Sequence, residues 1–157
     1  MIKKRGTFLA AFLAGMAILT LLDQWTKSLA VRHLMNQKPV VLIPDVFQLY
    51  YSENRGAAFG MLQGGQTFFM VVTLAVLGAV AYSLWRIPLQ KRFAPLAFCL
   101  LLLASGAAGN MIDRALQGYV VDFLYFSLIN FPIFNVADCY VTTGAFLLVF
   151  LLFFYYK

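Results

Sequence analysis

The sequence predicts an α-helical integral membrane protein with four transmembrane helices. Its 157 residues are 62% hydrophobic and only 11% charged, and the mean hydropathy is +0.82. One small water-soluble core cannot bury so much apolar surface. Four uncharged stretches of 17 residues or more follow one another along the chain, and about 20 apolar residues cross the roughly 30 Å hydrocarbon layer of a bilayer. We therefore expect a single membrane-embedded domain over residues 1–157.

The four spans are expected at about 6–22, 67–85, 93–112 and 139–156. The first follows "MIKKR" and resembles a secretory signal, but a small-x-small triplet occurs only at 28–30, beyond the charged "DQWTK", so we expect the helix to be retained. The second span is placed late in an uncharged stretch of 30 residues, because that stretch opens with "GAAFGMLQGG". Glycines and a glutamine suit a loop or a surface helix better than lipid.

Basic residues divide unevenly between the two faces that four spans create. Both termini lie on one face, which holds seven Lys or Arg and no acid, whereas the other holds five Lys or Arg and all six acids. The terminal face has Lys3, Lys4, Arg5, Arg86, Lys91, Arg92 and Lys157; the other has Lys27, Arg32, Lys38, Arg55 and Arg114 with Asp23, Asp45, Glu53, Asp113, Asp122 and Asp138. The positive-inside rule then predicts cytoplasmic termini. The net charge of +6 is explained by topology, and no nucleic-acid partner is expected.

The connections between the spans also show sequence patterns that predict local structure. "PVVLI" and "VFQLYYS" flank the turn dipeptide "PD" and predict a small extracytoplasmic β-hairpin. "NRGAAFGMLQ" suits a short surface helix, either a lid or substrate cradle or a plain connecting loop. "YVVDFLYF", between the third and fourth spans, should be extended at membrane level, where it must be covered by protein or line a wet cavity.

Cysteine and histidine predict no metal site. Cys99 and Cys139 lack metal-ligand spacing and are expected to be buried apolar side chains, and His33, the only histidine, is expected at the surface. Neither a metal nor a cofactor is expected.

Acids at the ends of the spans are the candidates for chemistry. Asp23 and Asp113 lie at span exits and Asp138 at a span entry, where a carboxylate is either solvated by headgroup water or kept for a task. Asp138 alone could simply be a helix N-cap. Asp122 lies among Val and aromatic residues, which should raise the pKa of its carboxyl.

Three kinds of function remain open from the residues alone. Asp122 and Asp138 could form an aspartic dyad, in which one carboxylate takes a proton from water and the other protonates a scissile carbonyl. The acids could instead hold Mg²⁺ or Ca²⁺, or form a cation path through a small transporter, although the spans are almost free of ionisable groups. A membrane scaffold whose acids cap helices and bind Arg is the third possibility.

Five ordered motifs resemble the signature blocks of lipoprotein signal peptidase, also called signal peptidase II. They are "DQWTK", "NRGAAFG", "GAAGNMIDR", "VVDF" and "FNVAD", and they extend from the first span to the fourth. One departure is visible: Ser105 stands where the third block usually has a glycine. Serine is small enough to preserve close helix packing.

The resemblance implies a bacterial inner-membrane aspartic endopeptidase with its active site near the outer surface. Such an enzyme removes the signal peptide from a prolipoprotein by cutting before a cysteine that carries diacylglycerol. The resemblance implies Asp122 and Asp138 as the catalytic pair. Asp113 is the alternative catalytic acid, although "DR" more simply indicates an acid held by an adjacent or cross-helix Arg114. The supporting positions are Asp23, Lys27, Asn54, Gly106, Asn110, Asp113, Arg114, Asn135 and Ala137. We expect a monomer whose partners are the lipid-modified substrate and membrane lipids.

Overall fold

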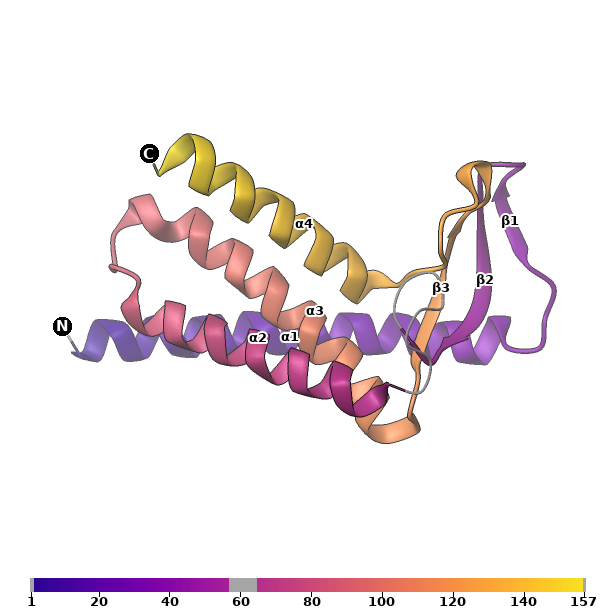
Figure 1. The fold of residues 1–157 in the computed structure, drawn as a ribbon, viewed down its shortest axis with the longest axis horizontal. Helices are drawn as coiled ribbons and strands as arrows, with labels where there is room; N and C mark the ends of the chain where they lie inside the picture. The colour runs from indigo at the N-terminus through magenta and orange to yellow at the C-terminus, as the bar shows by residue number, and fades with distance from the viewer. Residues whose placement is uncertain (1, 57–64, 157) are drawn as a thin grey trace.

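A computed structural model of the chain describes residues 2–56 and 65–156. The long helices are α1 (Ile2–Leu34), α2 (Gln66–Arg86), α3 (Ala94–Gln117) and α4 (Val136–Phe150), and the strands are β1 (Val40–Ile43), β2 (Phe47–Asn54) and β3 (Val120–Phe126). Short helical turns lie at η2 (Lys91–Phe93), η3 (Ser127–Ile129) and η4 (Leu151–Tyr155). Figure 1 shows the helices as an elongated bundle, with the sheet at the end opposite to both termini.

Four helices are long and apolar enough to cross a membrane, as predicted: Lys4–Leu34, Gln66–Arg86, Lys91–Gln117 and Val136–Tyr155. Two of them extend further than the uncharged stretches indicated. Helix α1 continues through Leu34, so residues 26–34, expected in the connection, are helical, and α3 continues to a left-handed C-cap at Gly118. Both extensions contain charged residues whose side chains are buried against one another, a pairing that hydropathy cannot detect.

The predicted hairpin is confirmed, and it belongs to a larger sheet. Strands β1 and β2 pair antiparallel, and β3 pairs with the other edge of β2, giving the order β1-β2-β3. The extended segment "YVVDFLYF" thus becomes the third strand, which the sequence did not pair with the hairpin. Its Val121 and Phe123 pack with Ala30 and Leu34 of the α1 extension. This contact attaches the sheet to the bundle.

Helix α3 lies at the centre of the bundle and approaches α4 closely at glycines. A Cβ atom at Gly106 would collide with the carbonyl oxygen of Ala137, and one at Gly109 would collide with the carboxylate of Asp23. Ser105, the departure from the family pattern, is fully buried and donates its hydroxyl to the carbonyl oxygen of Leu101 in its own helix at 2.7 Å. The serine therefore fits without separating the helices.

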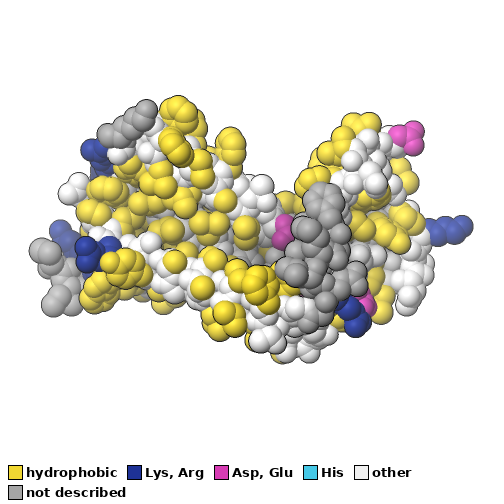
Figure 2. Space-filling model, in the orientation of Figure 1, with side chains coloured by type: hydrophobic (Ala, Val, Ile, Leu, Met, Phe, Trp, Pro, Cys, Tyr) yellow, Lys and Arg dark blue, Asp and Glu magenta, His cyan; other side chains and the backbone are white. Residues whose placement is uncertain are grey.

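The remaining expectations concern single residues and one segment. Cys99 is buried as expected, but Cys139 is exposed, because it lies on the side of α4 that faces an open cleft. His33 lies at the surface. The surface helix expected in 54–63 falls almost entirely on residues 57–64, outside the described residues. Large apolar side chains such as Ile18, Leu21 and Phe146 are exposed. Figure 2 shows hydrophobic side chains over much of the visible face of the bundle, which is typical of lipid-facing helices.

Candidate functional site

Asn135 joins the two acids of the predicted dyad. Its side-chain amide donates to Oδ1 of Asp122 at 2.6 Å, and its backbone N–H donates to Oδ2 of Asp138 at 3.1 Å. The bond to Asp138 is part of a capping box, since Asn135 is the N-cap of α4 and its side-chain oxygen accepts from the Asp138 N–H at 3.0 Å. Asp138 is therefore the third residue of the first turn and not the N-cap, which leaves one of its carboxylate oxygens available for other partners.

Chain reversal between β3 and α4 brings the acids together. Asn130 adopts a left-handed conformation (φ 48°), and the returning segment pairs with β3 where the N–H of Phe134 donates to Leu124 O at 3.0 Å. The chain therefore turns back on itself around Asn130, which lets the start of α4 return to β3.

Asp122 is only 2% exposed and lies in the middle of β3. Its Oδ2 accepts from the side-chain amide of Asn54 at 2.9 Å, on the neighbouring strand β2. Burial, and secondly the nearby charge of Asp138, raise the pKa of Asp122 to about 7, although hydrogen bonds from Asn54 and Asn135 and the charge of Lys27 oppose the rise. The carboxyl of Asp122 can therefore hold a proton near neutral pH.

Asn110 connects Asp138 to a buried lysine. The Asn110 side-chain amide donates to Oδ1 of Asp138 at 2.8 Å, while its carbonyl oxygen accepts from Lys27 Nζ at 2.9 Å and from Asn135 Nδ2 at 3.2 Å. The two asparagines fix each other's orientation, because each oxygen faces a donor and each amide faces an acceptor.

Lys27 forms a buried ion cluster with two further acids. Its Nζ lies 3.0 Å from Oδ2 of Asp23 and 3.0 Å from Oδ2 of Asp113, and all three side chains are at most 4% exposed. The other oxygen of Asp23 accepts from the backbone N–H of Ala137 at 2.9 Å, and Oδ2 of Asp113 also accepts from that of Val121 at 3.0 Å. Asp23 thus binds the residue immediately before Asp138, and Asp113 binds the residue immediately before Asp122.

The partner expected for Asp113 was wrong. Asp113 is paired with Lys27 across the helices, whereas Arg114 turns away, stacks over the ring of Phe69 at 4.8 Å and donates to Gly56 O at 3.3 Å. Adjacent residues on a helix point in directions about 100° apart, so the sequence neighbours do not share a face.

A cleft of about 510 Å³ opens beside Asp138. It is lined by Asn54, Gly56, Arg114, Phe131, Pro132, Ile133, Phe134, Asp138, Cys139, Thr142 and Thr143. In Figure 2 the molecule is hollowed between the bundle and the sheet, with an acidic side chain visible in the hollow. Asp122 and Asp138 therefore lie next to a cleft that is mainly apolar with a few polar groups. Such a cleft is typical of a site for a partly apolar substrate.

Sequence reasoning missed several residues of the site. Gln24 donates to Asp113 Oδ1 at 2.9 Å and to Asp23 Oδ2 at 3.2 Å, and its place inside "DQWTK" was the available signal. Cys139, Thr142 and Thr143 line the cleft from α4, and a helical spacing of four residues from Asp138 could have identified Thr142.

Gly106 and Ala137 lie where α3 meets α4, behind the cleft. Among residues 2–56 and 65–156, no three His, Cys, Asp or Glu side chains are grouped so that they could hold a metal ion. The expectation that no metal takes part stays a prediction.

Comparison with known proteins identifies the family. Residues 15–154 match the family model described as signal peptidase (SPase) II. The chain is 47% identical over 128 residues to a lipoprotein signal peptidase of Brevibacillus brevis, covering 82% of this chain and 85% of that protein. It is 44% identical over 138 residues to one of Streptococcus thermophilus, covering 87% and 89%.

Solved structures agree with the sequence relatives. A bacterial membrane enzyme superposes with a TM-score of 0.80 at 33% identity, covering 92% of this chain and 94% of that one. A second, also described as a bacterial membrane enzyme, gives 0.79 at 31% identity with 93% and 89% coverage. The matched span, the relatives and the architecture lead to one conclusion: the chain belongs to the signal peptidase II family of membrane aspartic peptidases.

Proposed function

We propose that the protein removes the signal peptide from diacylglyceryl-modified prolipoproteins by cutting before the lipidated cysteine, with Asp122 and Asp138 as the catalytic dyad. The observation that carries the proposal is the position of Asn135, which donates to both carboxylates, at 2.6 Å to Asp122 and 3.1 Å to Asp138. A single side chain and its own backbone thereby keep the two acids at one site beside the cleft.

The proposed reaction uses one proton shared by the pair. The ionised carboxylate takes a proton from a water molecule while the water oxygen bonds to the scissile carbonyl carbon, and the protonated carboxyl gives its proton to the carbonyl oxygen. When the tetrahedral intermediate collapses, the C–N bond breaks and the leaving nitrogen receives a proton from the dyad. A carboxyl whose pKa is raised to about 7, as for Asp122, can supply that acid near neutral pH.

The cleft supports a lipid-modified substrate. Phe131, Ile133 and Phe134 give its wall an apolar character, and the site lies near the end of α3 and the start of α4, where spans meet the sheet. Diacylglycerol chains would remain in the bilayer while the peptide bond reaches Asp138. We further propose cytoplasmic termini and a site near the outer surface, because Lys4, Arg5, Arg86, Lys91 and Arg92 gather at the terminal end of the bundle.

A peptide pair tests the proposed substrate. The protein purified in detergent should cleave a precursor peptide whose cysteine carries diacylglycerol, with one new N-terminus at that cysteine by mass spectrometry. The matched peptide with an unmodified cysteine should be cleaved at least about a hundredfold more slowly, because it lacks the remote binding energy of the acyl chains. Equal rates for the two peptides would contradict lipid recognition, and cleavage at another bond would contradict the site of action.

The pH dependence should follow the shared proton. Because the pKa of Asp122 is raised to about 7, raising the pH through 7 removes the acid from the pair, and kcat/KM should then fall, approaching tenfold per pH unit. The Asn54 hydrogen bond lowers that pKa, so Asn54→Ala should move the midpoint of the fall to higher pH. The measurement is a set of initial rates between pH 5 and 9. A flat profile across that interval would argue against a shared proton.

A further inference from the structure

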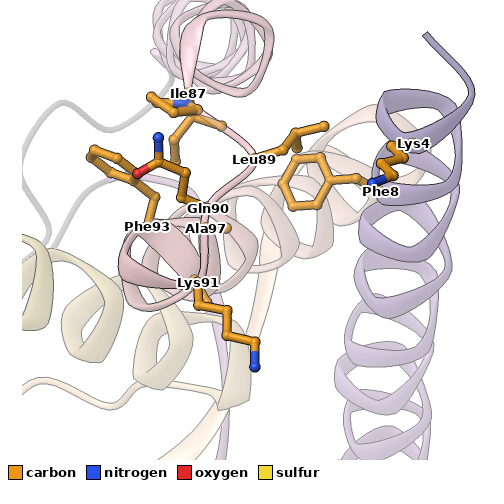
Figure 3. A pocket seen from close by; sticks show the side chains of 10 residues that line it. Lys4, Phe8, Ile87, Leu89, Gln90, Lys91, Phe93 and Ala97 are labelled. Carbon is orange, nitrogen blue, oxygen red and sulfur yellow. The ribbon is translucent and has the colours of Figure 1, made fainter. Parts of the chain in front are cut away.

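A second pocket lies at the opposite end of the bundle, far from the acids. Its volume is about 310 Å³, and it is lined by Lys4, Phe8, Ile87, Pro88, Leu89, Gln90, Lys91, Phe93, Ala94 and Ala97. Helix α1 forms one wall, and the connection between α2 and α3 with the start of α3 forms the other. Figure 3 shows Phe8 and Leu89 facing each other, with Lys4 beside Phe8 and Lys91 on the connection.

The pocket is built on a fixed frame. Arg5 donates to the carbonyl oxygens of Leu84 at 2.7 Å and Trp85 at 2.8 Å with one nitrogen, and to that of Ile87 at 2.8 Å with the other. These bonds satisfy carbonyls that the end of α2 leaves unpaired and tie that end to α1. The Arg5 guanidinium is thereby occupied, and the two walls are held at one separation.

Lys4 and Lys91 are the basic residues of the pocket lining that are available to bind a ligand. Within the described residues neither has an acidic partner within 4.0 Å, and no acid lines the pocket. Arg86 and Arg92 are placed elsewhere, over the rings of Tyr82 and Tyr156 at 5.9 Å each. The adjoining helix α3 begins with no side-chain cap and no acid in its first turn, so its positive end adds to the field of the lysines.

Both lysines lie at membrane-boundary depth. The uncharged stretches of the first and third helices begin at Gly6 and at Phe93, each two residues after one of these lysines. This places the two ammonium groups at the level of headgroup phosphates. The rest of the lining is largely apolar, and it extends from the buried Ile87 to the exposed Leu89. A ligand of this pocket should therefore join a negative charge to a hydrocarbon part.

We propose that this pocket binds an anionic phospholipid of the leaflet at the terminal end, with the glycerol and upper acyl carbons against Phe8 and Leu89 and the headgroup charge attracted by Lys4 and Lys91. Basic pockets between transmembrane helices are suited to such headgroups. The site is independent of the cleft beside Asp138, because the two pockets share no lining residue.

Binding to defined lipids tests the proposal. The full chain in detergent is titrated with phosphatidylglycerol, phosphatidylcholine and inorganic phosphate, and bound lipid is counted by native mass spectrometry. Phosphatidylglycerol should bind more tightly than phosphatidylcholine, and inorganic phosphate should not displace it. Each lysine near a lipid phosphate is worth about fivefold in affinity, so Lys4→Gln with Lys91→Gln should weaken phosphatidylglycerol binding by about 25-fold.

The matched control removes the same charge from the same end of the bundle. This control is the double variant Arg86→Gln with Arg92→Gln, whose two residues lie outside the pocket lining. It should weaken phosphatidylglycerol binding by less than about threefold. An equal loss of phosphatidylglycerol affinity in the two double variants would overturn the proposed pocket. It would indicate instead a general attraction between basic residues and anionic lipids. Displacement by inorganic phosphate, or equal affinity for phosphatidylcholine, would overturn the phospholipid as its occupant. Because both lysines are exposed, an unchanged melting temperature in lipid-free detergent is expected and confirms that the variant is folded.

Discussion

Asp122→Asn and Asp138→Asn are each expected to lower the rate of precursor cleavage by about 10⁴-fold, the upper end of what general acid–base catalysis contributes. Asparagine nearly preserves the shape of the side chain but can neither take a proton from water nor give one to the carbonyl oxygen. Since Asn54 and Asn135 donate to Asp122, and Asn110 and Asn135 donate to Asp138, the surrounding amides need only local reorientation. The check is single-turnover cleavage of the diacylglyceryl-modified peptide, with a melting curve in the same detergent.

Two comparisons make that result specific. Asp45→Asn removes the same charge from an exposed hairpin turn and should retain full activity. Asp113→Asn disturbs the ion cluster behind the site. It should lower the melting temperature while changing the cleavage rate much less than the two dyad variants do. Full activity in either dyad variant would refute the assignment, and inactivity accompanied by unfolding would favour purely structural acids. Activity lost on chelation in the unsubstituted protein would indicate a metal.

Lys27→Met is expected to be the most destabilising single substitution near the site. It removes the positive charge that Asp23 and Asp113 share at 3.0 Å each, and leaves those carboxylates buried without a counterion. Breaking a buried ion pair in this way costs about 3–5 kcal/mol, which for a chain of this size lowers the melting temperature by about 6 °C or more. Thermal unfolding in a fixed detergent measures the change.

The matched control is Lys38→Met, which deletes an exposed lysine on the same side of the membrane and should alter stability by about 0.5 kcal/mol or less. Adding Asp113→Asn to Lys27→Met should recover part of the loss, because one unpaired charge is then removed. If Lys27→Met melted at the same temperature as Lys38→Met, the cluster would contribute nothing to the fold, and its role as a support for the dyad would be untenable.

Composition and local pattern were sufficient for most of the fold. Four apolar stretches predicted the four helices, and the "PD" turn predicted the hairpin. The α1 extension was missed because Asp23 and Lys27 interrupt the apolar run, and hydropathy treats a charged residue as solvated whether or not it has a partner. The pairing of β3 with β2 was missed because 65 residues separate the two strands, and register between distant strands depends on tertiary packing.

The candidate site was predicted less from single residues than from the family resemblance. Taken alone, Asp138 looked like an N-cap, and only the structure shows that Asn135 caps the helix while Asp138 occupies the third position. Asp113 was given the wrong cation, since adjacency in "DR" suggested Arg114 although Lys27 reaches it from another helix. Contacts between elements decide both points, and no local pattern encodes them.

The ion cluster has a consequence for how the enzyme can move. Lys27 fixes Asp23 and Asp113, and these two acids hold the backbone N–H groups of Ala137 and Val121, one residue ahead of Asp138 and Asp122. The relative positions of these two carboxyls therefore depend on a single ammonium group, which is not part of the cleft lining. A change at this one buried position should alter the geometry of both carboxyls together. A change in the cleft wall at Phe131 or Phe134 leaves every contact of the ion cluster in place, because neither residue takes part in it.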